Sequence, residues 1–297
     1  MGASCYADDL LLLAPSRSAM EAMIKVCEKY ALDNNISFST HEDPTKSKTK
    51  CLYICGDINR RDYPAALKLN GKDLPFVTTA THLGHELSQD GTMSTDLKLK
   101  RAKFIDKSTE IREMFCFADP VQVLKAVNIY CGDYYGSMLW DLYGDPAGKY
   151  YRCWNTCTKL TWNCPRSTHT YFVTCQLAAD FVPIRTKILA KYVKFFQSLL
   201  NSNSPEVALV ANLVGHDVSS TTGGNLYRLG QETGLNPWTA SPIMVRMALQ
   251  QSDSVVPEED LWRLPLLEKL LLQRYNLELE VKDTSEVQSL IDSLCSS

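Results

Sequence analysis

Two adjacent aspartates, Asp8 and Asp9, are the residues of this sequence best placed to do chemistry. They stand between an apolar approach and an unbroken apolar run at residues 10–14, which predicts a β-hairpin with the acids at its tip. The run itself predicts a strand buried on both faces. Ionised carboxylates resist burial unless a cation meets them, and Mg²⁺ prefers such hard oxygen ligands. The pair therefore indicates either a magnesium site or an acidic turn before a core strand.

An amphipathic helix is predicted after the hairpin, over residues 16–35. Ser18 and Glu21 have the spacing of a capping box. We expect the apolar face of this helix to pack against the strand at residues 10–14. Its members recur at helical spacing and are Met23, Val26, Cys27, Tyr30 and Ala31.

A lysine-bearing polar loop comes next, between predicted strands at residues 36–39 and 51–55. Lys46 and Lys48 lie in it. By itself this loop indicates solvated side chains. Beside a phosphate, a lysine could instead neutralise the charge that builds on a leaving group and donate a proton to it.

Two glycine turns follow. Asn70–Gly71 suits a type I′ hairpin turn. Leu83–Gly84 either marks a β-bulge or lets the backbone approach a nucleic-acid backbone closely.

From Ser94 the pattern becomes helical. Lys100, Lys103 and Lys107 recur at i, i+3 and i+7 and so share one helix face. Such lysines could contact phosphates, which positions a duplex without reading its sequence, or form an ordinary solvated face. We expect the opposite, buried stripe to contain Leu97, Phe104, Ile105, Ser108, Ile111 and Phe115.

Further helices are predicted downstream. Asp119–Pro120 is a helix start, with the acid as N-cap and proline at N1. Tyr150, Tyr151, Trp154 and Trp162 alternate with bases, so they either stack nucleobases or form core. Residues 219–224 indicate a loop. The other predicted helices cover residues 184–200, 206–214, 225–233, 242–251, 257–275 and 285–294, and the leucine-rich stretch at 264–272 needs a partner surface.

Three segments resemble the reverse transcriptases of non-LTR, LINE-like retrotransposons. Tyr6-Ala7-Asp8-Asp9 resembles the Tyr-Ala-Asp-Asp palm motif, and residues 44–48 resemble motif D. Leu83–Gly84 resembles motif E, the primer grip, although His82 stands where that family often has an aromatic residue. The segments at residues 140–141, 154–155 and 165–169 extend the resemblance beyond the thumb.

The resemblance implies an α+β chain. Residues 1–92 would be part of a palm with a β-hairpin, helix and antiparallel strands, 93–200 a helical thumb, and 201–297 a helical C-terminal region. It also implies an RNA-directed DNA polymerase, with template RNA and DNA primer as partners and Mg²⁺ as cofactor. The implied catalytic residues are Asp8, Asp9 and Lys46, with Lys48 as second choice, and Asp8 and Asp9 would bind the metal. The implied nucleic-acid contacts are Tyr6, Leu83, Gly84, Lys100, Lys103 and Lys107.

The family's fingers and first palm aspartate precede this motif. We therefore expect the chain alone to be inactive, since two-metal phosphoryl transfer needs more carboxylates than Asp8 and Asp9. An upstream polymerase segment could supply them in trans. The alternatives are a non-catalytic nucleic-acid-binding protein derived from a retroelement remnant, and a remnant without molecular function.

Composition is that of an ordinary globular protein, with 45% hydrophobic and 22% charged residues in 297, so wholesale disorder is excluded. The net charge of −3 conceals a basic middle at residues 149–194 and an acidic stretch beyond residue 253. No apolar run reaches the ~20 residues that span a bilayer. Without a recognisable secretory signal, we expect a cytoplasmic or nuclear protein, not a secreted or membrane one.

Eleven cysteines are best explained as reduced thiols, several of them buried. Cys153, Cys157, Cys164 and His169 have donor types that zinc accepts, but their order does not match a zinc knuckle. Cys153 and Cys157 are one helical turn apart, which favours a packed helix face.

Overall fold

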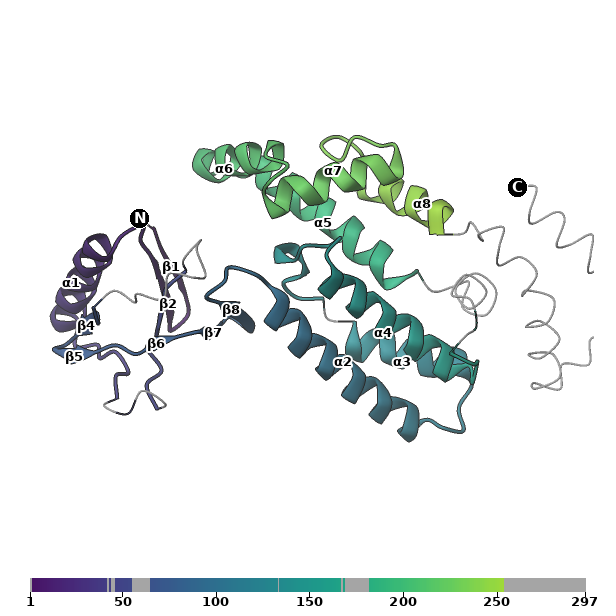
Figure 1. Ribbon diagram of the computed structural model, residues 1–297, viewed down its shortest axis with the longest axis horizontal. Helices are drawn as coiled ribbons and strands as arrows, with labels where there is room; N and C mark the ends of the chain where they lie inside the picture. The colour runs from purple at the N-terminus through teal and green to yellow at the C-terminus, as the bar shows by residue number, and fades with distance from the viewer. Residues whose placement is uncertain are drawn as a thin grey trace, which may run out of the picture.

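The described residues of the turn-rich sequence before residue 90 form short strands and one helix, and the 3.6-residue pattern beyond it forms helices (Figure 1). The expected α+β class is confirmed at this coarse level. This computed structural model describes residues 2–41, 43, 46–54, 65–132, 134–166, 168 and 182–253.

The N-terminal residues form the predicted hairpin. Strand β1 (Gly2–Tyr6) pairs antiparallel with β2 (Asp9–Leu13), and the register puts Tyr6 opposite Asp9. Ala7, the first turn residue, has φ +54°, in the left-handed region that two-residue hairpin turns use.

The prediction that residues 10–14 are buried on both faces is wrong. Leu13 is 58% exposed and Leu10 38%, while Leu12 packs against a small core. Among the described residues this sheet has two strands, and helix α1 contacts β2. Within the described residues, these neighbours bury only part of the hairpin's apolar surface.

Helix α1 (Arg17–Asp33) begins two residues earlier than a cap at Ser18 would allow. Its N-cap is Ser16, whose Oγ accepts a hydrogen bond from the first-turn backbone at 3.3 Å. The predicted capping box is wrong, because Glu21 Oε1 pairs instead with Arg17 Nε at 2.9 Å.

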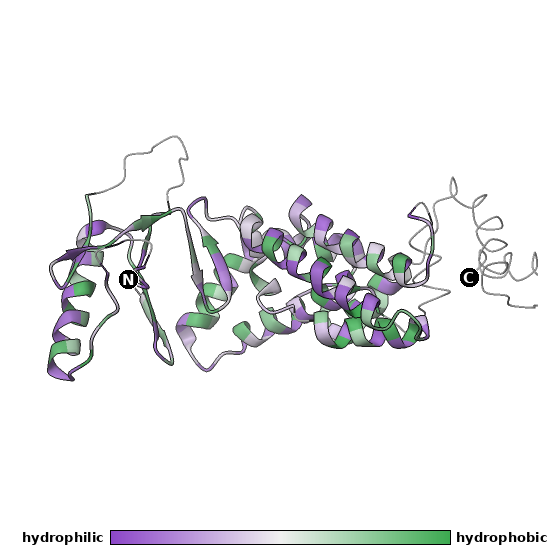
Figure 2. Ribbon diagram, turned by 90° about the horizontal axis from the view of Figure 1, so that it is seen from below, coloured by the Kyte–Doolittle hydropathy of each residue, from purple (hydrophilic) through white to green (hydrophobic). Residues whose placement is uncertain are grey.

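The predicted apolar stripe of α1 is only partly buried. Ala31 is buried, but Val26 is 69% exposed and Tyr30 61%. Figure 2 shows polar and apolar residues following one another around this helix. The small core that α1 does join is formed by Ile24, Leu67, Leu69 and Leu74.

Short strand pairs follow α1. The Asn70–Gly71 turn has φ values of +53° and +75°, which confirms the hairpin of β4 (Lys68–Leu69) and β5 (Lys72–Asp73). Strand β3 (Cys51–Leu52) pairs in parallel with β6 (Phe76–Val77), so not all strands are antiparallel as expected.

The strand predicted over residues 36–39 is wrong. This segment is held through the Ser39 carbonyl, which accepts hydrogen bonds from Thr49 N at 3.3 Å and Thr49 Oγ1 at 2.9 Å.

The second half of the described chain is helical apart from its first hairpin, which consists of β7 (Thr79–His82) and β8 (His85–Ser88). Residues 219–224, predicted as a loop, instead contain the start of α7, capped by Ser220. The helices predicted at 257–275 and 285–294 lie outside the described residues. The helical elements are α2 (Ser94–Met114), α3 (Pro120–Cys131), η1 (Ser137–Leu139), α4 (Asp145–Thr161), α5 (Ile184–Leu200), α6 (Pro205–His216), α7 (Thr221–Thr233) and α8 (Pro242–Asp253).

One large core joins these helices. Trp140, Tyr192 and Phe196 are almost wholly buried in it. Asp119 caps α3 as predicted, and its carboxylate accepts from Val121 N at 2.7 Å. No helix of the described chain is both long and apolar enough to cross a membrane.

Only some of the residues that were predicted to be buried join this core. Ile105 on α2 and Phe115, the C-cap of that helix, are exposed, contrary to prediction. The other predicted members of the stripe are buried: Leu97, Phe104, Ser108 and Ile111. Tyr150, Tyr151 and Trp154 are buried too, so these aromatics are core.

Candidate nucleic-acid interface

The two aspartates lie at the exposed end of the β1–β2 hairpin. Asp8 is in the turn and Asp9 opens β2, and Tyr6, across from Asp9, is 68% exposed. Their carboxylates are hard oxygen donors that suit Mg²⁺. Among the described residues, no group of three His, Cys, Asp or Glu side chains comes together to hold a metal ion. The aspartates therefore fit part of a magnesium site.

Lys46, the predicted catalytic lysine, lies in an exposed turn. Its ammonium is 3.9 Å from Asp43 Oδ2, three residues earlier. Lys48, two residues on, is also exposed. The structure thus places Lys46 with a loop acid and gives no polar contact between its described atoms and either Asp8 or Asp9.

The Leu83–Gly84 turn is a hairpin tip, not a bulge. Leu83 and Gly84 have φ values of +48° and +76°, and they join β7 to β8 directly. A β-carbon at Gly84 would lie 3.9 Å from Tyr135 Cε1. The turn therefore packs beside an aromatic ring that belongs to the segment before η1.

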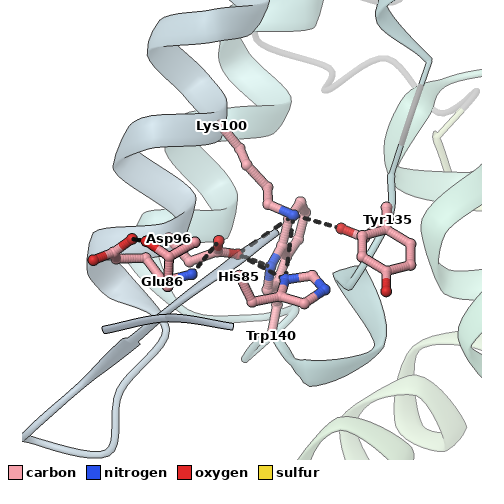
Figure 3. Close-up of polar contacts among 7 residues, drawn as sticks. His85, Glu86, Asp96, Lys100, Tyr135 and Trp140 are labelled. Carbon is pink, nitrogen blue, oxygen red and sulfur yellow. Dashed lines mark hydrogen bonds and ion pairs between the residues drawn. The ribbon is translucent and has the colours of Figure 1, made fainter. Parts of the chain in front are cut away.

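A buried carboxylate fastens this hairpin to the helices (Figure 3). Asp96, in the first turn of α2, is 2% exposed. Its Oδ1 accepts from the Glu86 backbone N–H of β8 at 3.1 Å. Its Oδ2 accepts from Trp140 Nε1 at 3.1 Å. One side chain thereby joins hairpin, helix and core.

Lys100 and His85 complete this network. Lys100 Nζ and His85 Nδ1 each lie 3.7 Å from Asp96 Oδ2, and 3.4 Å from one another. Lys100 Nζ also donates to the Tyr135 carbonyl at 2.6 Å. We define the β8–α2 junction as His85, Glu86, Asp96, Lys100, Tyr135 and Trp140.

The three predicted duplex-binding lysines therefore divide into two kinds. Lys100 is drawn inward, with only 17% of its side chain exposed, whereas Lys103 and Lys107 are exposed. Lys107 Nζ lies 6.0 Å from the Tyr130 ring centroid, within cation–π range. The structure shows Lys100 as a junction residue and leaves Lys103 and Lys107 facing solvent on α2.

Several bases of the predicted basic middle, residues 149–194, are less available to bind a polyanion than their charge indicates, because they already form contacts within the protein. Arg185 makes two 2.7 Å hydrogen bonds to Glu232, a charge partner far along the sequence. Lys149 and Arg152 both pair with Asp145. Each of these bases already faces a carboxylate, part-buried for Arg185 and exposed for Lys149 and Arg152.

Two further lysines of this region are half-buried. Lys187 Nζ donates to Asn128 Oδ1 at 2.7 Å, and Lys159 Nζ donates to the Arg166 carbonyl at 3.3 Å. Burial lowers the pKa of both lysines.

The described cysteines of the candidate zinc group are packed in or beside the hydrophobic core. Cys157 is buried in the core, and burial raises the pKa of its thiol. Cys164 is buried as well, while Cys153 packs at the core's margin. His169 lies outside the described residues. The helix-face interpretation is supported for Cys153 and Cys157.

Sequence reasoning passed over His85, Asp96 and Tyr135. One available signal was an acid in the first turn of a predicted helix, beside a lysine four residues on. Searches of family models, curated proteins and solved structures gave no match to this chain. The geometry and the sequence motifs therefore carry the functional argument.

Proposed function

We propose that this chain is the palm-and-thumb part of a non-LTR retrotransposon reverse transcriptase, an RNA-directed DNA polymerase by descent. The observation that carries the proposal is the Tyr6-Ala7-Asp8-Asp9 string, which turns at Ala7 and Asp8 and presents both acids at an exposed hairpin end. Helix α1, the β7–β8 hairpin with its Leu83–Gly84 turn, and the lysine-bearing helix α2 follow in the order that the resemblance implies.

Each site residue has a role in this proposal. Asp8 and Asp9 would hold Mg²⁺, which when bound stabilises the negative charge of the reacting phosphates. The primer 3′-hydroxyl attacks the nucleotide's α-phosphate and breaks the α–β bond. Lys46 would have to move from Asp43 to face the departing pyrophosphate. The proposed contacts to the primer–template are Tyr6, Leu83, Gly84, Lys103 and Lys107.

Catalysis in this proposal needs more than this chain's hairpin. Two-metal phosphoryl transfer clamps both attacking and leaving oxygens, which requires carboxylates beyond one adjacent pair. The described residues bring no third metal-binding side chain to Asp8 and Asp9. We therefore propose that polymerisation depends on an upstream polymerase segment, supplied in trans if not in the same chain. We propose a cytoplasmic or nuclear location, where such an RNA template and DNA primer would be found.

A second candidate is a non-catalytic nucleic-acid-binding protein built from the same fold. The exposed Lys103 and Lys107 favour it, because they face solvent whether or not the aspartates bind metal. Phosphate contacts of this kind give affinity without sequence preference.

Primer extension on an RNA template with Mg²⁺ separates the two candidates. We expect no extension by the chain alone, and extension that an Asp8→Asn variant abolishes once an upstream segment is added. Extension by the chain alone would show that its own residues complete the metal site. Extension that survives Asp8→Asn would contradict the catalytic role of the hairpin.

Salt-dependent binding tests the lysine face directly. We expect the Lys103→Gln/Lys107→Gln variant to bind a primer–template duplex more weakly, with a log K against log salt slope lower by about 1.8 for two lost phosphate contacts. The matched control is Lys191→Gln/Lys194→Gln, two exposed lysines on α5. Equal losses in both variants would argue for non-specific charge attraction.

A further inference from the structure

Tyr135 is a half-exposed aromatic residue whose ring packs against a buried aromatic ring. Its ring stacks on that of His85, with centroids 4.7 Å apart and planes inclined by 21°. His85 is buried, yet Tyr135 remains 51% exposed. The exposed surface of the tyrosine must therefore lie away from the histidine.

The position of this ring is fixed from several directions. Lys100 Nζ holds the Tyr135 carbonyl at 2.6 Å. The next residue, Gly136, has φ +76°, and a β-carbon there would lie 1.6 Å from His85 Cε1. Figure 3 shows His85 and Lys100 on the same side of the tyrosine. A ring held in this way loses little conformational freedom when a ligand stacks on it.

The surroundings of the ring match those of nucleic-acid platforms. The Gly84 turn lies against its edge, 3.9 Å from Cε1, and Lys100 Nζ lies 5.7 Å from its centroid. Aromatic rings beside cations stack bases of any sequence, because every base has a π-face.

We propose that Tyr135 is a stacking platform for a nucleobase. The base would stand at the end of a nucleic-acid strand that contacts the Leu83–Gly84 turn and the exposed Lys103 and Lys107 of α2. This assignment rests on the proposed nucleic-acid binding and adds to it a contact that does not depend on charge. Its ligand class is a terminal or unpaired base of DNA or RNA.

Two other exposed tyrosines among the described residues lack this construction. Tyr130 has Lys107 beside it, but no ring of the described residues stacks on it. Tyr227 is 54% exposed on α7, among residues of a different surface groove. Tyr227 therefore offers a matched control for the loss of an exposed tyrosine ring.

The test is fluorescence-anisotropy binding of a labelled primer–template by the full chain and its variants. We expect Tyr135→Leu to weaken binding roughly 5- to 100-fold, as the loss of one base–aromatic stack does. Tyr135→Phe should retain binding, and Tyr227→Leu should be unchanged. The salt slope of Tyr135→Leu should equal that of the wild type, because no phosphate contact is lost.

A photocrosslinking measurement keeps the proposal testable if Tyr135→Leu fails to fold. Irradiation of the wild-type chain with a primer bearing 3′-terminal 5-iodouracil should give a crosslink at Tyr135, mapped by mass spectrometry. Crosslinks confined to other residues, or unchanged affinity in folded Tyr135→Leu, would overturn the platform alone. No binding by the wild-type chain would overturn the proposed function as well.

Discussion

The indole of Trp140 donates its Nε1–H to Asp96 Oδ2 at 3.1 Å, across a separation of 44 residues. Both side chains are almost wholly buried. Because Asp96 also accepts from the β8 backbone, this pair connects the hairpin at the candidate interface to the helical core.

Removing this carboxylate should destabilise the helical part strongly. We expect Asp96→Ala to lower the free energy of unfolding by about 3 kcal/mol, because the mutation leaves the buried Trp140 N–H without its acceptor and removes the carboxylate that forms an ion pair with Lys100. Urea denaturation followed by tryptophan fluorescence measures the loss. Asp106→Ala, an exposed acid on the same helix, should change it by less than about 0.5 kcal/mol. Equal effects would contradict the assigned role of Asp96.

Substitution by alanine should destabilise the protein more at Gly136 than at Gly234, a glycine of similar φ. Gly136 and Gly234 have φ values of +76° and +66°, so alanine pays about 1–2 kcal/mol of backbone strain at either position. A β-carbon at Gly234 meets nothing within 4 Å, whereas at Gly136 it would collide with the His85 ring. Thermal unfolding should therefore show a clearly larger loss for Gly136→Ala. A similar loss at both sites would mean that His85 moves aside at little cost.

The ion pair between α5 and α7 should make stability depend on pH. Burial by itself would raise the pKa of Glu232, but hydrogen bonds and charge from Arg185, with a hydrogen bond from Tyr143, outweigh it and lower the pKa. A carboxylate whose folded pKa is depressed stabilises the fold above its unfolded pKa, near 4.5, and that contribution disappears as pH falls through the folded value.

Comparison of the wild type with Glu232→Gln reports this effect. The difference in free energy of unfolding should be largest near pH 7 and should shrink progressively below pH 4.5. A difference that stays constant down to acid pH would show that the carboxylate's charge contributes nothing.

Thiol reactivity should separate packed from accessible cysteines. Burial raises the pKa of Cys157, and the thiolate is the reactive form, so iodoacetamide should label it only after unfolding. Cys5 and Cys116 are exposed and should react in the native chain. Mass mapping of labelled peptides measures both. A zinc chelator that made Cys157 reactive without denaturant would favour the metal-site interpretation instead.

Local sequence signals predicted local structure well. Asn70–Gly71 and the apolar residues on either side of Asp8 and Asp9 predicted two hairpins, and Asp119–Pro120 predicted the start of α3. These signals succeed because left-handed turn residues and side-chain caps act over two to four residues. The predicted helix over residues 184–200 is confirmed for the same kind of reason, since helical periodicity is also local.

Which side chains are buried, and which charged groups pair, was decided only by the tertiary structure. The sequence could not show that Leu13 stays exposed, because exposure depends on how many neighbours cover a hairpin. Nor could it distinguish Lys100 from Lys103, one helical turn apart on the same predicted face. Lys100 turns inward because Asp96 and the Tyr135 carbonyl both lie within its reach. The sequence by itself determined the motif, the turns and the helices. Which charges meet, and which ring stands beside the Leu83–Gly84 turn, followed from packing between residues far apart in the chain.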